Sequence, residues 1–422
     1  MIFMSLLKQF QDFSPSEWKG MKAGLKRISE ACEAFGHPEK RFPSIHIAGT
    51  NGKGSVAAML HSILSEAGMK VGLFTSPHLV RVNERFRVGR EEMTDGELQE
   101  TLETITDKYP FPSQGLTFFE LCTLVAFLSF AEKKVDIAVL ETGLGGRLDA
   151  TNVVQPSVSV ITEISLDHTE ILGDDLPSIA REKAGIVKPM VPLVCGTTDE
   201  EARKVIAKTA EEKGAPIFWP ERDLKDLDVG LPGEHQRRNA AIALKTLEVL
   251  KNTDAFRPWR TRLSESAIRD GLARVRWPGR LEWLSRNPPV VLDGAHNPAG
   301  VKALADYLQE KKNVKWKVLF SSAKDKDVPG MLKILRTVSG DITVCPIASE
   351  RSIDPKIFSA DTSLHTAEAA VKAYQRILDG LKPGEGLVVT GSLYLVGEIK
   401  KFTVGEPRGA QHGGGRIPRR SR

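Results

Sequence analysis

The sequence has 422 residues, of which 41% are hydrophobic, 27% charged and 6% aromatic. This composition is typical of a globular chain and excludes a wholly disordered one, and the length predicts one large and one small domain. The best candidate for a membrane span, residues 121–131, is bounded by charged residues and falls short of the roughly 18 residues that a span needs. The N-terminus, MIFMSLLKQF, lacks a basic n-region and a small-residue cleavage site. We therefore expect neither a secretory signal nor a membrane partner.

Most of the net charge of +5 belongs to the C-terminal tail. Residues 405–422 hold five arginines against one glutamate, so the rest of the chain is nearly neutral. Because the tail is glycine-rich and lacks an apolar period, we expect it to be disordered rather than to bind nucleic acid. The four cysteines show neither paired nor metal-ligand spacing, which favours a reducing, cytoplasmic setting.

The first half of the chain alternates between strand-like and helix-like patterns. Short apolar strands are expected at residues 44–48, 71–74, 135–140, 157–162 and 191–195. After the first strand, apolar residues from Val56 to Ala67 follow the 3.6-residue helical period, and Gly68 ends the helix. Strands separated by helices predict a parallel sheet covered by helices.

Two further helices begin at predicted capping boxes. Thr94 with Glu97, and Thr117 with Glu120, have the spacing in which each side chain bonds the other residue's backbone N–H. The second box predicts an apolar helix over 118–132. Another helix is expected around 176–184.

A second alternation begins near residue 290. Its strands are expected at 290–293, 316–320, 342–346 and 386–391, and its helices at 299–311 and 366–378. The stretch 277–289, which contains proline, glycine and tryptophan, is the predicted linker. We therefore predict an α/β protein with a large parallel-sheet domain over 1–286, a smaller Rossmann-like α/β domain over 287–404 and the basic tail over 405–422.

The strongest chemical signal is a glycine-rich loop between the first strand and its helix. Its residues are Gly49, Thr50, Asn51, Gly52, Lys53, Gly54 and Ser55. Backbone N–H groups and the helix N-terminus can surround an anion there, Lys53 can reach a β- or γ-phosphate, and the Ser55 hydroxyl can hold Mg²⁺. The spacing differs from the common G-x-x-x-x-G-K-[ST], and the alternative is a turn that binds nothing. Strand, lysine, serine and helix together favour ATP binding, so the large domain is predicted to be a P-loop-type ATPase domain.

Two other side chains belong with this loop by their position in the predicted sheet. Glu141 directly follows the strand at 135–140, and His168 follows the strand at 157–162. Parallel α/β sheets bind ligands at the carboxyl ends of their strands. Each residue alone is more often a polar loop residue, but beside a phosphate loop both become candidate Mg²⁺ ligands.

Periodicity leaves two segments undecided. Lys183, in REKAGIVKP, has the composition of a solvated helical lysine. Asp293 lies at a strand end in DGAHNP, where the simple interpretation is a helix cap at Asn297 before Pro298.

Nine motifs resemble, in order from about residue 20 to about residue 400, the folylpolyglutamate synthase/dihydrofolate synthase family of the Mur ligase superfamily. They are GTNGKGS (49–55), TSPHL (75–79), ETGLGGRLDATN (141–152), DHTEILG (167–173), EKAGI (182–186), PGEHQRRN (232–239), WPGR (277–280), DGAHNP (293–298) and TGSLYLVGE (390–398). Each motif is moderately specific, whereas nine in order are very specific.

The resemblance implies roles for particular residues. Glu141, His168 and Ser55 match Mg²⁺ ligands, and Lys183 matches a lysine that is carbamylated in the family and can then serve a second Mg²⁺. The matches to ATP-binding positions beyond the phosphate loop are His235, Gln236, Asn239, Arg280 and Asp293. The matches to catalytic positions are Lys53, Lys183, Arg280 and His296. The matches to positions on the pterin or folate side are Ser76, Pro77, Thr117, Phe119 and Asp149.

The implied reaction is ATP-dependent amide formation. ATP converts a carboxylate into an acyl phosphate, and the amine of L-glutamate then attacks it, releasing ADP and phosphate. We expect dihydropteroate and reduced folates as acceptors, ATP and Mg²⁺ as co-substrate and cofactor, and a monomer. A monofunctional dihydrofolate synthase is the nearest alternative, and a muropeptide ligase is a more distant one.

Alternatives from other classes remain open at this point. A P-loop switch NTPase would turn over ATP without glutamate. A nucleic-acid binder would depend on the basic tail. A Rossmann dehydrogenase is disfavoured because GLGG at 143–146 lacks the G-x-G-x-x-G spacing.

Overall fold

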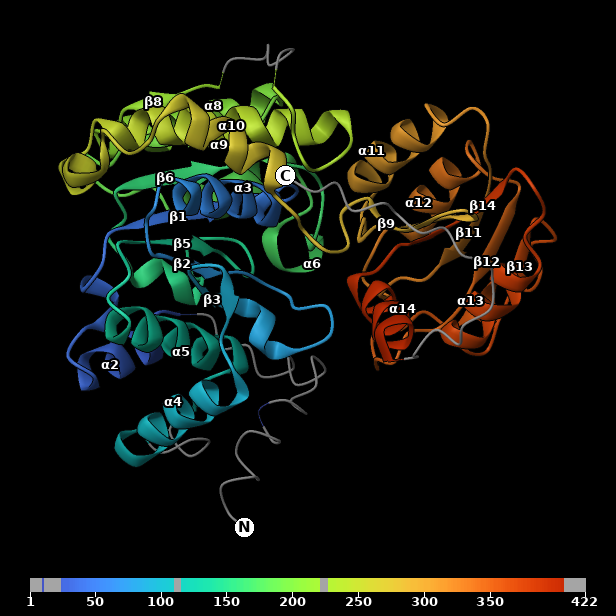
Figure 1. The fold of residues 1–422 in the computed structure, drawn as a ribbon, viewed down its shortest axis with the longest axis horizontal. Coiled ribbons are helices and arrows are strands. Elements are labelled where there is room, and N and C mark those ends of the chain that lie inside the picture. Colours follow the sequence, from blue (N-terminus) through green and yellow to red (C-terminus); the bar gives the residue numbers. More distant parts are fainter. Residues whose placement is uncertain (1–9, 11–23, 110–114, 221–226, 406–422) are drawn as a thin grey trace, which may run out of the picture.

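The computed structural model describes residue 10 and residues 24–109, 115–220 and 227–405. These residues form two α/β units, the first blue to yellow and the second orange to red in Figure 1. Apart from Gly405, the predicted tail lies outside the described residues. Within the described ranges, no helix is long and apolar enough to cross a bilayer.

The first unit is built on a sheet that has eight strands among the described residues, in the order β4-β3-β2-β5-β1-β6-β7-β8. The strands are β1 (Ser44–Ala48), β2 (Val71–Phe74), β3 (Phe86–Val88), β4 (Glu91–Glu92), β5 (Ile137–Glu141), β6 (Val158–Ile161), β7 (Leu193–Cys195) and β8 (Ile217–Phe218). The predicted parallel arrangement is confirmed for the six neighbouring strands β2-β5-β1-β6-β7-β8. β3 and β4 add an antiparallel edge that was not expected.

Helices cover both faces of this sheet (Figure 1). They are α2 (Lys26–Ala34), α3 (Lys53–Glu66), α4 (Asp95–Lys108), α5 (Phe118–Glu132), α6 (Thr169–Leu172), α7 (Leu176–Ala184), α8 (Glu200–Glu212), α9 (Glu234–Lys251) and α10 (Glu265–Arg274), with short 3-10 turns η2 (Pro38–Lys40), η3 (Val82–Arg85), η4 (Ala150–Val153) and η5 (Asp254–Trp259). Alternate residues of β5 face opposite layers: Ile137 and Val139 pack with α3, α9 and α10, whereas Ala138 and Leu140 pack with α2, α4 and α5. Both predicted capping boxes are confirmed, at the starts of α4 and α5.

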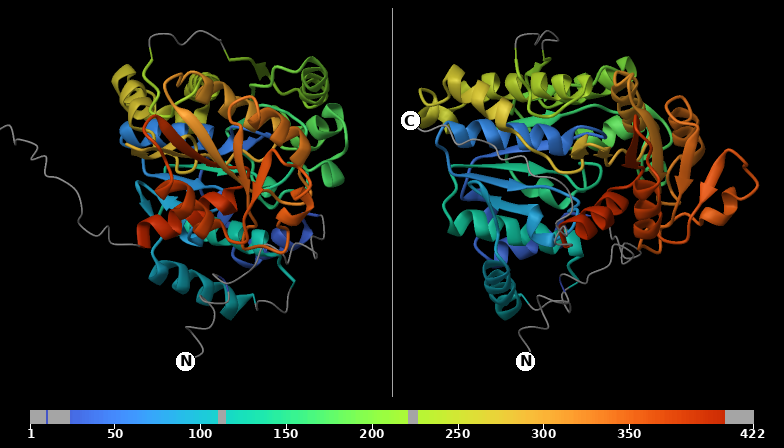
Figure 2. Two further views of the ribbon diagram at one scale, coloured as in Figure 1. Left: turned by 90° about the vertical axis from the view of Figure 1, so that its right-hand side faces the viewer. Right: turned by 45° about the vertical axis from the view of Figure 1, so that its right-hand side comes forward.

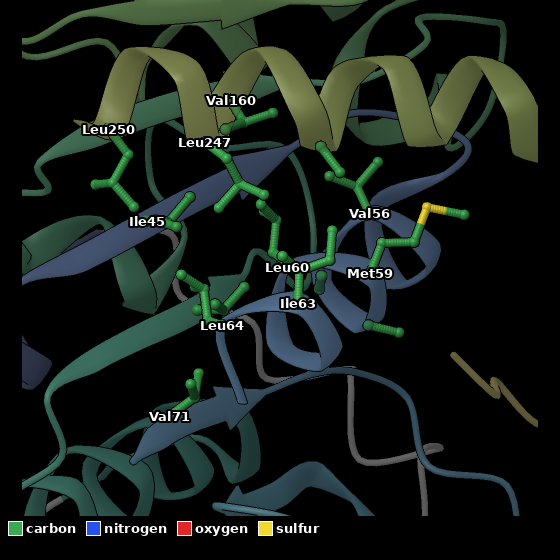
Figure 3. Close-up of a cluster of buried hydrophobic side chains, with 14 of the residues drawn as sticks. Ile45, Val56, Met59, Leu60, Ile63, Leu64, Val71, Val160, Leu247 and Leu250 are labelled. Carbon is green, nitrogen blue, oxygen red and sulfur yellow. The ribbon is translucent and has the colours of Figure 1, made fainter. Parts of the chain in front are cut away.

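The helix that follows the glycine-rich loop is buried almost all round. Figure 3 shows Leu60 and Ile63 of α3 directed into a cluster that also holds Ile45 of β1 and Leu247 of α9. Burying each such side chain stabilises the fold by about 1.5–3 kcal/mol. Dense packing on this helix holds the loop at its N-terminus in a fixed place on the sheet.

The second unit has a six-stranded sheet within the described residues, in the order β13-β12-β11-β14-β10-β9. Its strands are β9 (Glu282–Arg286), β10 (Pro289–Leu292), β11 (Lys315–Phe320), β12 (Asp341–Val344), β13 (Leu364–Thr366) and β14 (Glu385–Thr390). Its helices are α11 (Pro298–Gln309), α12 (Val328–Leu335), α13 (Ala370–Asp379) and α14 (Leu393–Gly405), with the turn η6 (Pro355–Phe358). α11 and α12 pack on one face and α13 and α14 on the other, as a Rossmann-like layer arrangement requires.

Two sequence expectations need correction in this unit. The stretch 277–289 is not all linker, because β9 lies within it and pairs antiparallel with β10 in the second sheet. The helix expected at 366–378 starts later, at Ala370, because Thr366 ends β13. We therefore propose that the second unit begins near Gly279, somewhat before the expected boundary at 286.

The two units touch through backbone as well as side chains. Gly397 on α14 packs on the segment after β2, where a Cβ atom on it would lie 2.1 Å from the carbonyl oxygen of Leu79. The right-hand view of Figure 2 shows the red C-terminal helix beside the blue part of the first unit. A side chain at position 397 would therefore push the units apart. Beside this contact, the carboxyl ends of β5, β1 and β6 form adjacent positions on the first sheet.

Candidate functional site

The glycine-rich loop follows β1 and leads directly into α3. Gly49 has φ +151° and Gly52 has φ +91°, backbone angles that suit glycine. Cβ atoms on them would lie 1.8 Å from Thr162 Oγ1 and 2.4 Å from Asn239 Oδ1, respectively. Both glycines are thus required by close approach, and the loop is held between β6 and α9.

The side chains of Thr50 and Lys53 in the loop are engaged within the first unit. Thr50 Oγ1 donates to the carbonyl of Ser165 (3.0 Å) and accepts from its N–H (3.1 Å). Lys53 Nζ donates to the carbonyls of Gly49 (3.1 Å) and Thr50 (3.4 Å), so its ammonium lies over the loop where a phosphate would bind. Ser55 is buried in the first turn of α3.

Glu141 ends β5 beside this loop. Its Oε2 accepts from the N–H of Ser76 (3.2 Å) and lies 3.5 Å from where a Cβ on Gly54 would stand. Burial raises its pKa, against the opposing charges of Lys53, Arg280 and Arg85. Ser76, predicted on the pterin side, thus contacts Glu141, a predicted metal ligand. The peptide bond between Ser76 and Pro77 is cis.

Lys183 is a buried lysine, contrary to the solvated residue that its composition indicates. It is 4% exposed, and its Nζ donates to the carbonyl of Gly49 (2.8 Å), at the start of the phosphate loop. Burial and the charge of Lys53 lower its pKa to about 7. A neutral amine is the form that reacts with CO₂, so this environment suits the carbamylation that the resemblance implies.

Asp167 connects the two units. Its carboxylate bonds Lys326 Nζ, accepts from Asn297 Nδ2 (3.1 Å) and lies 3.4 Å from His296 Nε2. Burial alone would raise the pKa of Asp167, but the hydrogen bond and charge of His296 and the charge of Lys326 outweigh burial and lower the pKa below its usual value. The sequence patterns did not single out Asp167 or Lys326 as site residues, although Asp167 is the first residue of the DHTEILG motif.

His168 is the N-cap residue of α6 and faces the same junction. Its Nε2 lies 3.3 Å from Lys326 Nζ, and burial lowers its pKa to about 3, so the neutral ring accepts this hydrogen bond. A metal ion at Nε2 would therefore replace the lysine.

Asn297 links the phosphate loop to the second unit. Its amide exchanges two hydrogen bonds with the amide of Asn51 (3.1 and 3.3 Å) while Oδ1 caps α11 through the N–H of Gly300 (2.8 Å). The cap that the sequence predicts is present, and it also bridges the units. His296, beside it, contacts the carbonyl of Gly294 through Nδ1 (2.8 Å).

Arg280 and Asp293 lie on the second-unit side of the junction. Asp293 accepts from the N–H groups of Leu281 (2.8 Å) and Ala295 (2.9 Å), so it braces the turn around Arg280. Arg280 donates to the carbonyl of Gly279 (3.1 Å), and its charge acts on both Glu141 and His235.

The predicted base-side residues share the first turns of α9. Asn239 Nδ2 donates to Gln236 Oε1 (3.0 Å), and Gln236 Nε2 contacts His235 Nε2 (3.2 Å). Burial lowers the pKa of His235. Through Asn239, which meets Gly52, this chain of side chains reaches the phosphate loop.

The predicted pterin-side residues gather around the end of β2 and the start of α5. Thr117 caps α5, and the Phe119 ring lies 5.7 Å from the Phe74 ring and against Gly143. Asp149 accepts from the N–H groups of Gly143 (2.8 Å) and Leu144 (3.0 Å).

The chain's own donors partly fit a divalent cation. Among the described residues, no group of three or more His, Cys, Asp or Glu side chains could hold a metal. The candidate set instead combines the buried carboxylate of Glu141 with the hydroxyl of Ser55, and both are oxygen donors that a hard cation prefers. The Lys183 amine becomes such a donor only as a carbamate.

Comparison with family models matches both units. The Mur ligase middle domain matches residues 47–218. The Mur ligase glutamate ligase domain matches residues 279–393. The second match begins at the glycine that we propose as the start of the second unit.

The chain is also similar, over most of its length, to known proteins. It is 38% identical to the dihydrofolate synthase/folylpolyglutamate synthase of Bacillus subtilis, over 90% of this chain and 95% of that protein. The structure of E. coli FolC in complex with DHPP and ADP has a TM-score of 0.83 and 32% identity, covering 95% of this chain and 97% of the other. The bifunctional folylpolyglutamate synthase/dihydrofolate synthase of Yersinia pestis, complexed with AMPPNP and Mn ion, has a TM-score of 0.83 and 30% identity, covering 96% and 97%.

Proposed function

Because this chain belongs to the dihydrofolate synthase/folylpolyglutamate synthase family of Mur ligases, we propose that it is a bifunctional, ATP-dependent glutamate ligase. It adds L-glutamate to dihydropteroate and to reduced folates. The observation that carries the proposal is that the phosphate loop, which contacts Lys183 and lies beside Glu141, meets the second unit at Asn297.

The roles of the nucleotide-side residues follow from their positions. The loop from Gly49 to Ser55 holds the phosphates of ATP, and Lys53 moves from its two carbonyl partners onto the transferring phosphoryl group. Arg280 supplies a second positive charge from the other unit. Such charges act most strongly on the transferring group, where negative charge is spread during phosphoryl transfer.

Closure of the junction protects the intermediate. The acyl phosphate must meet the amine of glutamate before water, so the two units have to exclude solvent while holding three substrates in line. His296 and Asp293 reach the junction from the second unit, and His235, Gln236 and Asn239 define its base side. Ser76, Pro77, Thr117, Phe119 and Asp149 form the pterin side.

Glu141, Ser55, His168 and carbamylated Lys183 would hold divalent cations. The cation neutralises the phosphates of ATP when it is bound. The oxygen donors fit this role in place, whereas His168 first has to release Lys326.

The proposed setting is a monomer in the cytoplasm. All four cysteines are buried and unpaired, as expected in a reducing compartment. Light scattering across a range of protein concentrations tests the monomer.

The deciding experiment measures ADP release with Mg²⁺-ATP and L-glutamate, adding dihydropteroate and tetrahydrofolate separately. Glutamate-dependent turnover with both acceptors is expected. Turnover with dihydropteroate alone would establish the monofunctional alternative. ADP release that ignores both glutamate and the acceptors would establish a switch NTPase instead.

A further inference from the structure

The central strand of the first sheet carries one polar side chain in its middle. Ile45 and Ile47 point towards α3, and His46 between them is fully buried on the opposite side of β1. Its neighbours in the sheet are Leu140 and Ser159. An apolar side chain would fill this position at lower cost, so the imidazole needs an explanation.

The imidazole bonds one residue, Thr151, which in turn bonds Asp149. His46 Nε2 lies 2.7 Å from Thr151 Oγ1, and Thr151 Oγ1 donates to Asp149 Oδ1 (2.5 Å). His46 Nδ1 is buried and has no hydrogen-bond partner among the residues that the structure describes. The ring is therefore committed to Thr151 through a single nitrogen.

Donor and acceptor roles in this chain are fixed by Asp149. Burial raises the pKa of Asp149, but three backbone N–H groups, of Gly143, Leu144 and Thr151, point at its carboxylate and oppose this shift by favouring the ionised form. An ionised carboxylate only accepts, so the hydroxyl of Thr151 donates to it and must receive its own bond from His46 Nε2–H. Burial keeps the ring neutral by lowering the pKa of His46 to about 3.

The far end of the chain reaches the proposed pterin side. Asp149 Oδ2 holds the N–H groups of Gly143 and Leu144, and Gly143 packs directly on the Phe119 ring, where a Cβ would lie 2.7 Å from the ring. The Asp149 carboxylate accepts four hydrogen bonds from other groups of the protein, namely three backbone N–H groups and the Thr151 hydroxyl, and four is the usual capacity of a carboxylate. The carboxylate therefore holds the turn that supports Phe119.

We propose that His46 and Thr151 are positioning residues for the pterin substrate. They orient Asp149, and Asp149 holds the turn at Gly143 that packs against the Phe119 ring. This inference rests on the proposed function. It assigns to the core histidine a task beyond packing, because the rigidity of the aromatic wall depends on it.

The test uses matched variants and three Michaelis constants. Thr151→Val and His46→Leu remove the polar contacts at similar volume, and the KM for dihydropteroate should rise about tenfold, as expected for a hydrogen bond to a charged group. The KM values for ATP and glutamate should stay within about twofold. Thr151→Ser should restore the KM for dihydropteroate, because it keeps the hydroxyl.

Two further substitutions keep the test informative if the apolar variants do not fold. His46→Gln places an amide N–H where Nε2 stands, whereas His46→Asn places it near Nδ1. Only the glutamine variant should retain the wild-type KM for dihydropteroate. His61→Leu is the matched control, because His61 is also buried but bonds the carbonyl of Gly89, away from Asp149.

Two results would overturn the proposal, and they are distinguishable. If the wild-type chain shows no pterin-dependent turnover, the proposed function fails and the inference falls with it. If the wild type turns over normally and the His46 and Thr151 variants change all three KM values alike, or only the melting temperature, then His46 is a core residue and only the positioning role fails.

Discussion

Replacing Lys53 by alanine separates the chemistry of the phosphate loop from its structure. In the structure the ammonium donates to two carbonyls of its own loop, and it stands near the buried amine of Lys183, whose charge repels it. Losing two such hydrogen bonds, while relieving that repulsion, should change the free energy of unfolding by no more than about 1 kcal/mol. In a unit of this size that corresponds to about 2–4 °C in Tm.

The effect on turnover should be far larger. Removing a group that stabilises the charge of a transition state costs about 3–4 kcal/mol, or about 10²–10³-fold in kcat. The assay is glutamate-dependent ADP release, with thermal unfolding measured on the same sample. Lys302→Ala is the control, since Lys302 is an exposed lysine on α11 that pairs with Asp306 on the same helix, and its kcat should equal that of the wild type. A kcat for Lys53→Ala within threefold of wild type would refute the assignment of the loop, and a Tm loss above about 10 °C would refute the structural argument.

Three other predictions follow from the buried charges. Wild-type protein kept in bicarbonate should show the added mass of a carbamate by native mass spectrometry, and Lys183→Ala should show none. Asp167→Asn should lower the free energy of unfolding in urea by about 3 kcal/mol because it leaves Lys326 buried without its carboxylate, whereas exposed Asp174→Asn should change it little. Burial lowers the pKa of His61 to about 4, so below about pH 6.5 the unfolded chain binds a proton at this histidine that the folded chain does not. The free energy of unfolding should therefore fall as the pH falls from about 6.5 to 4, and it should fall less steeply in His61→Gln.

The sequence predicts the parts of the fold whose signal is local. The strand, loop and helix from Ser44 to Glu66, and the capping box at Thr117, appear in the structure where they were expected. The short strands β3, β4, β8 and β13 were missed, because two or three residues carry no measurable alternation and pair only through their neighbours in the sheet.

The site was predictable where residues follow strands, and less so where it spans the two units. Glu141 stands at a strand end, as the pattern indicates. The bond from Lys326 to Asp167 joins residues 159 positions apart, and no local pattern encodes it. His46 was read only as part of an apolar strand, because a buried polar contact to Thr151 leaves no periodic trace.

The mutual amide pair between Asn51 and Asn297 places the starts of two helices, α3 and α11, at one point, one from each unit. Helix N-termini carry partial positive charge, so polyphosphate held there attracts both units at once. The affinity for ATP and the equilibrium between open and closed units then share one coupling free energy. The factor by which closure increases the affinity for ATP equals the factor by which bound ATP favours the closed form. Replacing the side-chain amide of Asn51 or Asn297 would weaken ATP binding and closure by the same factor, even though neither side chain takes part in the chemistry.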